Sequence, residues 1–454
     1  MNRREFIALA GVVTPGWRPG LVKPPLTSPR PTPQQLAWQR AELALFVHFT
    51  VNTFTDREWG DGTESPNVFN PAHLDARQWV RVAQSGGFRT VILTAKHHDG
   101  FCLWPTATTT HSVRSSPWRD GRGDVVRELV DACRAGGLGV GVYLSPWDRH
   151  EPTYGDSPRY NDVYARQLTE LLTRYGPIVE VWFDGANGEG PNGKKQQYDW
   201  PRVHGIVRRL QPRALIFSDA GPDLRWIGNE RGVAGDPNWC PVDPAAVPYP
   251  GVSGDAVTAA LQHGDPHGTV WRPGEADVSI RPGWFWHAAE DDNVRAADDL
   301  VELYFSSVGR NAGLLLNVPP TRDGVFHDTD VARVAEFGRK RSAMFAADLA
   351  AGARRYDSPT GLDLELKRPV TFDVASLEEA IAYGQQVVRY TLLAQSGPGR
   401  PWTTLTRGTT IGHKKLDRFS PVTASRVRLT IDSALAPPRI ARVGLYSTGV
   451  VNRG

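Results

Sequence analysis

The feature that most constrains this chain is a regular alternation of apolar, strand-like runs with helix-forming segments from about residue 35 to about residue 320. Near-continuous apolar runs are typical of parallel strands that are covered on both faces. A helix between successive strands indicates parallel neighbours. This many units favour a (β/α)8-like (TIM-type) barrel, although an open parallel sheet shows the same alternation. The predicted strands cover residues 43–50, 90–95, 140–145, 178–185, 214–219, 224–230, 277–280 and 313–318.

The pattern changes at two other places in the chain. Between Arg231 and Glu275 the alternation stops, and the residues are rich in Pro, Gly and Asp. We predict that this connection is a functional loop without regular structure. After about Leu349, short alternating segments separated by turn residues predict a C-terminal antiparallel β-sandwich. The predicted domains are therefore a barrel over residues 35–348 and a sandwich over residues 349–454.

The N-terminus has the pattern of a targeting segment. Arg3 and Arg4 stand just before the short apolar run of residues 6–13, which matches a twin-arginine export signal. The run is too short to span a bilayer. We predict that residues 1–34 are this signal followed by a disordered linker, and that the protein is exported to the periplasm or the extracellular space. An ordinary basic, flexible N-terminus is the alternative.

Composition excludes several classes of function. A net charge of +3 over 454 residues gives no reason to expect nucleic-acid binding or an anionic membrane surface. Three cysteines at irregular spacing predict neither a disulfide framework nor a metal cluster. Fifteen tryptophans favour carbohydrate binding, although most of them serve equally well as core residues. The sequence does not predict an oligomeric state.

Polar residues gather at the ends of the predicted strands, which meet at the mouth of a barrel. A lone His or Glu at such a position is more often part of the scaffold, so the convergence carries the argument. His97 and His98 are adjacent, and adjacent strand residues point to opposite faces, so we predict no metal site and no cofactor. The candidates are His48, Glu58, Trp59, His97, His98, Tyr143, Trp182, Asp184, Asp219, Asn229 and Glu230.

The remaining chemistry is that of paired carboxylates. Asp184 follows the apolar run 178–183, and Glu230 ends the next strand but one. Two carboxyl groups across one sugar can cleave a glycosidic bond, because one attacks carbon and the other protonates the leaving oxygen. The proton donor needs a raised pKa, which apolar neighbours such as Trp226 and Ile227 would provide.

Five short motifs together resemble the α-L-fucosidases of glycoside hydrolase family 29, collinearly over about residues 35–345. They are Phe46-Val-His-Phe-Thr, Glu58-Trp-Gly, Lys96-His-His-Asp-Gly-Phe, Gly141-Val-Tyr-Leu-Ser and Val181-Trp-Phe-Asp-Gly. The resemblance implies a retaining mechanism with Asp184 as the nucleophile. It also implies fucose contacts from His48, Glu58, Trp59, His97, His98, Tyr143 and Trp182.

Two further segments resemble the subgroup of this family that is specific for α-1,3/1,4-linked fucose. The segment 225–232 implies that Glu230 is the acid/base, and the segment 281–286 implies that Arg281 and Trp284 line the sugar pocket. The expected partner is therefore a fucosylated, Lewis-type oligosaccharide. A broad-specificity fucosidase or another retaining glycosidase on the same barrel remains open, as does a non-catalytic glycan-binding protein.

Overall fold

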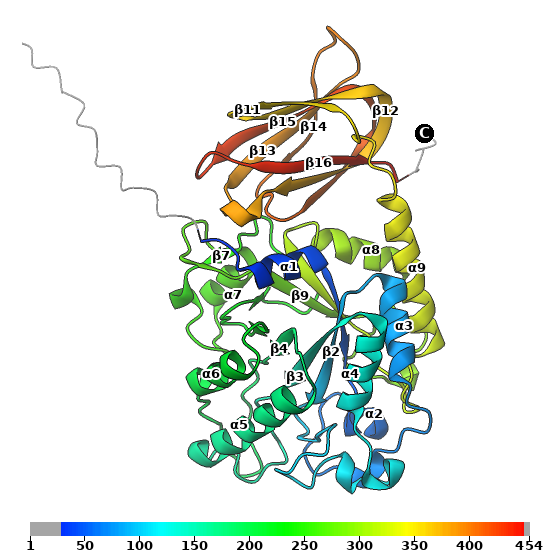
Figure 1. Ribbon diagram of the computed structural model, residues 1–454, viewed down its shortest axis with the longest axis vertical. Helices are drawn as coiled ribbons and strands as arrows, with labels where there is room; N and C mark the ends of the chain where they lie inside the picture. The colour runs from blue at the N-terminus through cyan, green and yellow to red at the C-terminus, as the bar shows by residue number, and fades with distance from the viewer. Residues whose placement is uncertain (1–28, 449–454) are drawn as a thin grey trace, which may run out of the picture.

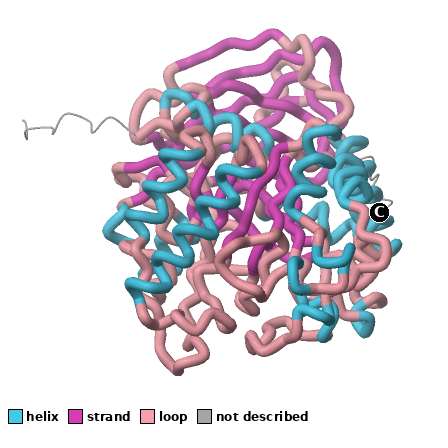
Figure 2. Tube along the Cα trace, turned by 60° about the horizontal axis from the view of Figure 1, so that its bottom comes forward, coloured by secondary structure: helices cyan, strands magenta, loops and turns pink. Residues whose placement is uncertain are grey.

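The computed structural model describes residues 29–448 of the chain, and the predicted export signal lies in the part outside them. Its larger part is a parallel barrel surrounded by helices (Figures 1 and 2). The eight strands follow the order β5-β4-β3-β2-β1-β10-β9-β6, and a bridge from Phe217 to Leu224 nearly closes the ring. The strands are β1 (Leu43–Val47), β2 (Thr90–Lys96), β3 (Gly139–Leu144), β4 (Glu180–Trp182), β5 (Leu215–Phe217), β6 (Arg225–Trp226), β9 (Gly274–Ser279) and β10 (Ala312–Asn317).

The barrel prediction is confirmed, and each predicted strand coincides with an observed one. Alternation along β1 shows how the sequence builds two cores: Leu45 packs outward under the helices, while Ala44 and Phe46 point into the barrel. The helices in described residues are α1 (Pro33–Ala41), α2 (Val51–Thr55), α3 (Ala76–Gly86), α4 (Val125–Gly136), α5 (Ser157–Arg174), α6 (Trp200–Leu210), α7 (Asp255–His263), α8 (Ala297–Ser306) and α9 (Asp328–Met344). Within these residues, no helix is both long enough and apolar enough to span a membrane.

The connection between Arg231 and Glu275 is more regular than predicted. It contains α7 and an antiparallel pair, β7 (Pro241–Val242) and β8 (Val270–Trp271). The helix was missed because Leu261 is its one buried residue, so it has no apolar stripe for the pattern to reveal. In addition, β9 begins at Gly274, three residues before the predicted strand. At the other end of the chain, α1 begins at Pro33, inside the segment predicted as linker.

The C-terminal part is antiparallel, with its own hydrophobic core. The long strands β12 and β15 shift register in their middle, so that the sheet folds over this core. The predicted boundary at residue 348 falls between α9 and β11. The strands are β11 (Arg354–Ser358), β12 (Gly361–Glu379), β13 (Val387–Gln395), β14 (Thr403–Gly408), β15 (Lys415–Ala434) and β16 (Ile440–Tyr446).

The sandwich packs against the end of the barrel where the strands begin. The backbone of Arg310, just before β10, forms an isolated antiparallel β-bridge with Lys415 of β15. Asn238 donates its backbone N–H to the hydroxyl of Thr410. In Figure 1, α1 lies beside the sandwich, whereas α2, which follows β1, lies at the far end. The carboxyl ends of the strands, where barrel proteins place their functional residues, are therefore directed away from the sandwich.

Candidate active site

A cavity of about 510 Å³ opens at the carboxyl ends of the barrel strands. It brings together all the residues predicted to act on or bind a sugar, except Arg281. Its lining residues are Phe46, His48, Glu58, Trp59, His97, His98, Tyr143, Trp182, Asp184, Ala186, Glu230, Asp277, Pro282, Gly283 and Trp284.

Asp184 follows β4 by two residues, and its carboxylate is held from two sides. The hydroxyl of Tyr143 donates to Oδ2 at 2.9 Å, and the backbone N–H of Ala186 donates to Oδ1 at 2.7 Å. The ring Nε2 of His98 lies 3.9 Å from Oδ2. Donors on both oxygens hold the carboxylate in a fixed orientation, as a nucleophile requires.

The aromatic groups around Asp184 are held in their neutral forms. Burial, and next the charge of Asp184, raise the pKa of Tyr143 well above its ordinary value, so its hydroxyl stays a donor. Burial lowers the pKa of His48 to about 3 and also lowers the pKa values of His97 and His98. Neutral imidazoles can both donate to and accept from sugar hydroxyls.

His97 and His98 face the same cavity, which contradicts the prediction that they point to opposite sides. Their ring centroids lie 4.1 Å apart, and both rings line the cavity wall. The cause is that β2 ends at Lys96, so the strand alternation no longer applies to the two residues after it.

Glu230 reaches the cavity from the segment after β6. Its Oε2 accepts a hydrogen bond of 3.3 Å from the indole Nε1 of Trp284. Burial raises the pKa of Glu230 above its ordinary value, and the charges of Asp184 and Glu58 raise it further. A carboxyl group whose pKa is raised by burial and by neighbouring carboxylates has the environment of a general acid.

Glu58 is fixed by the backbone of a distant segment. Its Oε2 accepts the N–H of Trp284 at 2.8 Å, and its Oε1 accepts the N–H of Phe285 at 3.0 Å. Gly283 permits this approach, because a Cβ added there would lie 2.3 Å from Glu58 Oε1. The contact therefore joins the loop after α2 to the segment after β9.

The floor of the cavity is aromatic. Phe46 contacts the rings of Tyr143, Trp182 and Trp284, with ring centroids between 5.3 and 6.3 Å apart. Trp182 in turn stacks on Phe217 at 4.1 Å and 11°. This apolar patch suits a sugar that carries a methyl group.

Arg281 lies outside the cavity, contrary to prediction. Its side chain is fully buried, with Nε 2.9 Å from Asp330 Oδ2 and an Nη1 2.8 Å from Asp291 Oδ1. Pro282 and Gly283 line the cavity in its place. Arg281 therefore fixes the start of the segment that carries Trp284, rather than touching a ligand.

Three polar residues with contacts to the site were not predicted to take part in it. Asp277 lines the cavity and accepts a 2.7 Å hydrogen bond from Trp226 Nε1. Burial, and next the charge of Glu230, raise the pKa of Asp277 well above its ordinary value. Asn317 orients His48, because its Oδ1 lies 2.8 Å from His48 Nδ1, and its amide donates to the carbonyl of Trp284. The third is His287, whose two ring nitrogens contact Asp56 and Glu58.

Two residues from the predicted strand ends stand apart from the cavity wall. Asp219 accepts the N–H of Gly251 at 2.8 Å and packs against Gly185, just outside the residues that line the cavity. Burial, and next the charge of Asp184, raise the pKa of Asp219 to about 6. Asn229 bonds within its own turn, accepting from Arg231 and donating to Val233.

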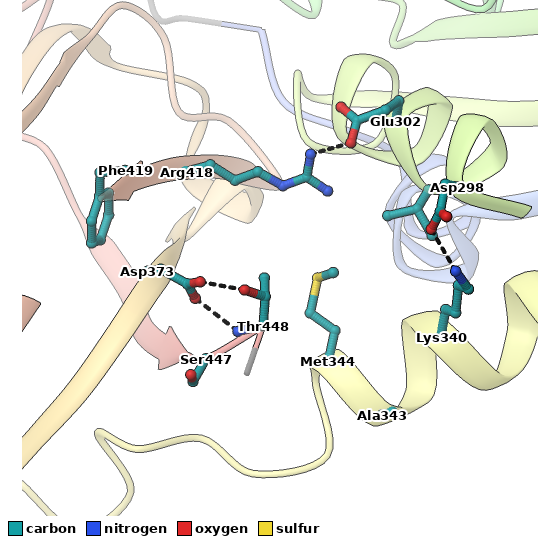
Figure 3. Close-up of a pocket in the computed structure, with 11 residues that line it drawn as sticks. Asp298, Glu302, Lys340, Ala343, Met344, Asp373, Arg418, Phe419, Ser447 and Thr448 are labelled. Carbon is teal, nitrogen blue, oxygen red and sulfur yellow. Dashed lines mark hydrogen bonds and ion pairs between the residues drawn. The ribbon is translucent and has the colours of Figure 1, made fainter. Parts of the chain in front are cut away.

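A second cavity, of about 630 Å³, lies between α8, α9 and the sandwich (Figure 3). Its charged side chains are paired with neighbours: Lys340 with Asp298 at 2.6 Å, and Arg418 with Glu302. Asp373 accepts from both the backbone and the hydroxyl of Thr448. With these carboxylates already engaged, the barrel cavity is the better candidate for carboxylate chemistry.

The chain matches the family described as "Alpha-L-fucosidase" over residues 33–223 and 251–340. It is 44% identical to α-L-fucosidase 1 of Arabidopsis thaliana over 450 residues, covering 92% of this chain and 87% of that protein. A solved glycoside hydrolase 29 family member from an unknown rumen bacterium is 41% identical with a TM-score of 0.88, covering 94% of this chain and 79% of that one.

A second solved structure is that of a Ruminococcus gnavus GH29 fucosidase in complex with fucose. It is 32% identical to this chain with a TM-score of 0.84, and the match covers 94% of this chain and 96% of that one. These likenesses span the barrel and the sandwich together. The chain therefore belongs to glycoside hydrolase family 29 and is an α-L-fucosidase.

Proposed function

We propose that this enzyme is a retaining exo-α-L-fucosidase, with Asp184 as the nucleophile and Glu230 as the acid/base. The observation that carries the proposal is the contrast between two carboxyl groups of one cavity. Asp184 accepts hydrogen bonds on both oxygens, whereas burial and nearby negative charge raise the pKa of Glu230. One group is thus suited to attack and the other to proton donation.

The reaction follows from these two states. Asp184 attacks the anomeric carbon of the fucosyl group, while Glu230 transfers its proton to the glycosidic oxygen and the carbon–oxygen bond breaks. A covalent fucosyl-enzyme ester results. Glu230, now a carboxylate, takes a proton from water, and the resulting hydroxide displaces Asp184. Fucose leaves with the configuration that it had in the substrate.

Fucose recognition is proposed for the residues around this pair. His48, His97, His98 and Glu58 present ring nitrogens and a carboxylate to the sugar hydroxyls, and Trp59 lies at the rim, where its side chain is 59% exposed. Phe46, Trp182 and Trp284 form the apolar patch that a 6-deoxy sugar needs for its methyl group. The fucose-bound relative from Ruminococcus gnavus supports this choice of sugar.

We further propose a preference for α-1,3/1,4-linked fucose on Lewis-type oligosaccharides. The support is the segment 225–232 that carries Glu230, together with the segment 281–286 that places Trp284 against it at 3.3 Å. Part of the connection between β6 and β9 also lies near the site, because Gly251 donates its N–H to Asp219, which packs against Gly185.

A substrate panel tests this linkage preference. We expect kcat/KM to be higher for Lewis-type trisaccharides than for 2′-fucosyllactose or a simple aryl fucoside. A higher value for either of the latter two would contradict the linkage assignment and indicate a broad-specificity enzyme. Binding of fucosylated glycans without any turnover would contradict the catalytic proposal itself.

Export by a twin-arginine signal is a further proposal, supported by Arg3 and Arg4 before the apolar run of residues 6–13. Replacing both arginines with lysine should retain the protein inside the cells that make it. Unchanged export of this double variant would contradict the proposal.

A further inference from the structure

Residues 281–287, which we call the bracket segment, connect the sugar-binding and acid/base sides of the cavity. Arg281 anchors the start of the segment through its buried contacts with Asp330 and Asp291. In its middle, Trp284 binds Glu58 through its backbone and Glu230 through its indole. The other end of the segment is His287, which closes back onto the loop that carries Glu58.

The ring of His287 lies between two carboxylates. Nδ1 is 2.8 Å from Oδ1 of Asp56, and Nε2 is 2.9 Å from Oε1 of Glu58. A neutral imidazole has one N–H, so it can donate to one of these acceptors and must turn a lone pair toward the other. Only the imidazolium satisfies both contacts, and the geometry therefore selects the charged ring.

The charged groups around the ring come from several elements, and the acids among them are closer than the bases. Arg281 reaches the carbonyl oxygen of His287 at 3.4 Å, and Arg322 approaches Asp56 at 4.0 Å. Burial disfavours the charge on His287, but its hydrogen bonds to Asp56 and Glu58 outweigh burial and raise its pKa. The groups concerned are Asp56, Glu58, Glu290, Arg281 and Arg322.

We propose that His287 is a positioning residue that, in its imidazolium form, holds the Glu58 carboxylate in place for the fucosyl group. The inference rests on the proposed contact between Glu58 and the sugar. When the ring loses its proton, one contact becomes repulsive and Glu58 loses a charged donor. The affinity for fucose then falls, although the reacting groups Asp184 and Glu230 are untouched by His287.

The direction of the pH effect follows from the raised pKa. Below that pKa the ring is charged and both contacts are made. As the pH rises through it, above the ordinary value of 6.5, the proton is lost and the affinity decreases. The effect therefore belongs to neutral and mildly alkaline solution.

The test is the dissociation constant of L-fucose between pH 6 and 9, measured by calorimetry on the full chain. A Glu230→Gln background removes the titration of the neighbouring acid. In this background we expect the affinity to fall about tenfold across the range, as loss of one charge-assisted hydrogen bond implies. His287→Gln should bind weakly and with little change across the same range.

Asp56→Asn gives a second, gentler variant, because the Asp56 side chain is 57% exposed. It removes one of the two carboxylates that hold the proton, so the midpoint of the affinity change should move to lower pH. His73→Gln is the control: its side chain is 79% exposed beside Asp323, and it should keep the parent midpoint.

Three outcomes overturn the inference. If Glu58→Gln weakens fucose binding but His287→Gln keeps the parent affinity and pH response, His287 has no positioning role. An unmoved midpoint in Asp56→Asn would have the same meaning. If Glu58→Gln itself leaves the affinity unchanged, the proposed sugar contact of Glu58 is wrong, and the inference that depends on it fails with it.

Discussion

The hydroxyl of Tyr143, at the end of β3, donates a 2.9 Å hydrogen bond to Oδ2 of Asp184, at the end of β4. The two strands are parallel neighbours, with Tyr143 in register with Trp182. This register therefore places the phenol of Tyr143 beside the carboxylate of Asp184, which follows Trp182 by two residues. Because burial keeps the Tyr143 hydroxyl protonated, it orients Asp184 and stabilises its charge.

Replacing Tyr143 with Phe should lower kcat/KM about tenfold to a hundredfold, as expected for a hydrogen bond to a charged group. Steady-state kinetics on an aryl fucoside measure this. Tyr390→Phe is a matched control, since it removes a buried tyrosine–carboxylate bond, to Asp417, in the sandwich. Equal losses of activity in both variants would show that Tyr143 acts through stability alone.

Glu230→Gln keeps the shape of the side chain but removes the transferable proton. For oligosaccharides with poor leaving groups we expect kcat/KM to fall about 100- to 10,000-fold, with a much smaller loss for activated aryl fucosides. Glu302→Gln, at the second cavity, should leave both substrates unaffected. A loss that did not depend on the leaving group would argue against Glu230 as the acid.

The pH profile should carry the signature of Glu230. Burial and nearby charge raise its pKa above 4.5, and the group acts while protonated. Activity on oligosaccharides is therefore present below this raised pKa and is lost as the pH rises through it. Measured kcat/KM against pH should show a fall through the raised pKa of Glu230 that disappears in Glu230→Gln, which leaves only the fall at higher pH expected from His287. If the fall at the pKa of Glu230 persisted unchanged in that variant, it would belong to another group.

Arg281→Ala should destabilise the fold by about 3–5 kcal/mol, because it leaves the fully buried Asp330 without its cation. Denaturant unfolding measures this loss. Arg202→Ala removes an exposed ion pair with Asp162 and should cost less than about 1 kcal/mol. Similar stabilities for the two variants would contradict the anchoring role of Arg281 and would favour the predicted role as a pocket residue.

Much of the barrel could be predicted from the sequence, because strands that are covered on both faces consist of nearly continuous runs of apolar residues. Polar residues just after such runs, for example Asp184, were therefore placed at the mouth. The helix α7 escaped prediction since it buries only Leu261. The predicted directions of the His97 and His98 side chains were wrong, because the prediction extended the strand alternation past Lys96, where β2 ends.

Long-range partners lie beyond a pattern-based prediction. The resemblance implied that Arg281 lines the sugar pocket, whereas the fold brings Asp330 and Asp291 to its side chain. Asp277 looked like part of a buried strand, and its carboxyl group proved to line the cavity. His287 follows directly after the segment 281–286, but its carboxylate partners stand about 230 positions earlier in the chain. The roles proposed for the site residues remain predictions for experiment.

The most direct test of the account is Asp184→Gly assayed with and without azide. We predict that turnover of an aryl fucoside falls by at least about a thousandfold, because no covalent intermediate can form. Azide, which fits the vacated space, should restore part of the rate and yield a fucosyl azide. An Asp184→Gly variant that remains active without azide would contradict the assignment of Asp184 as the nucleophile.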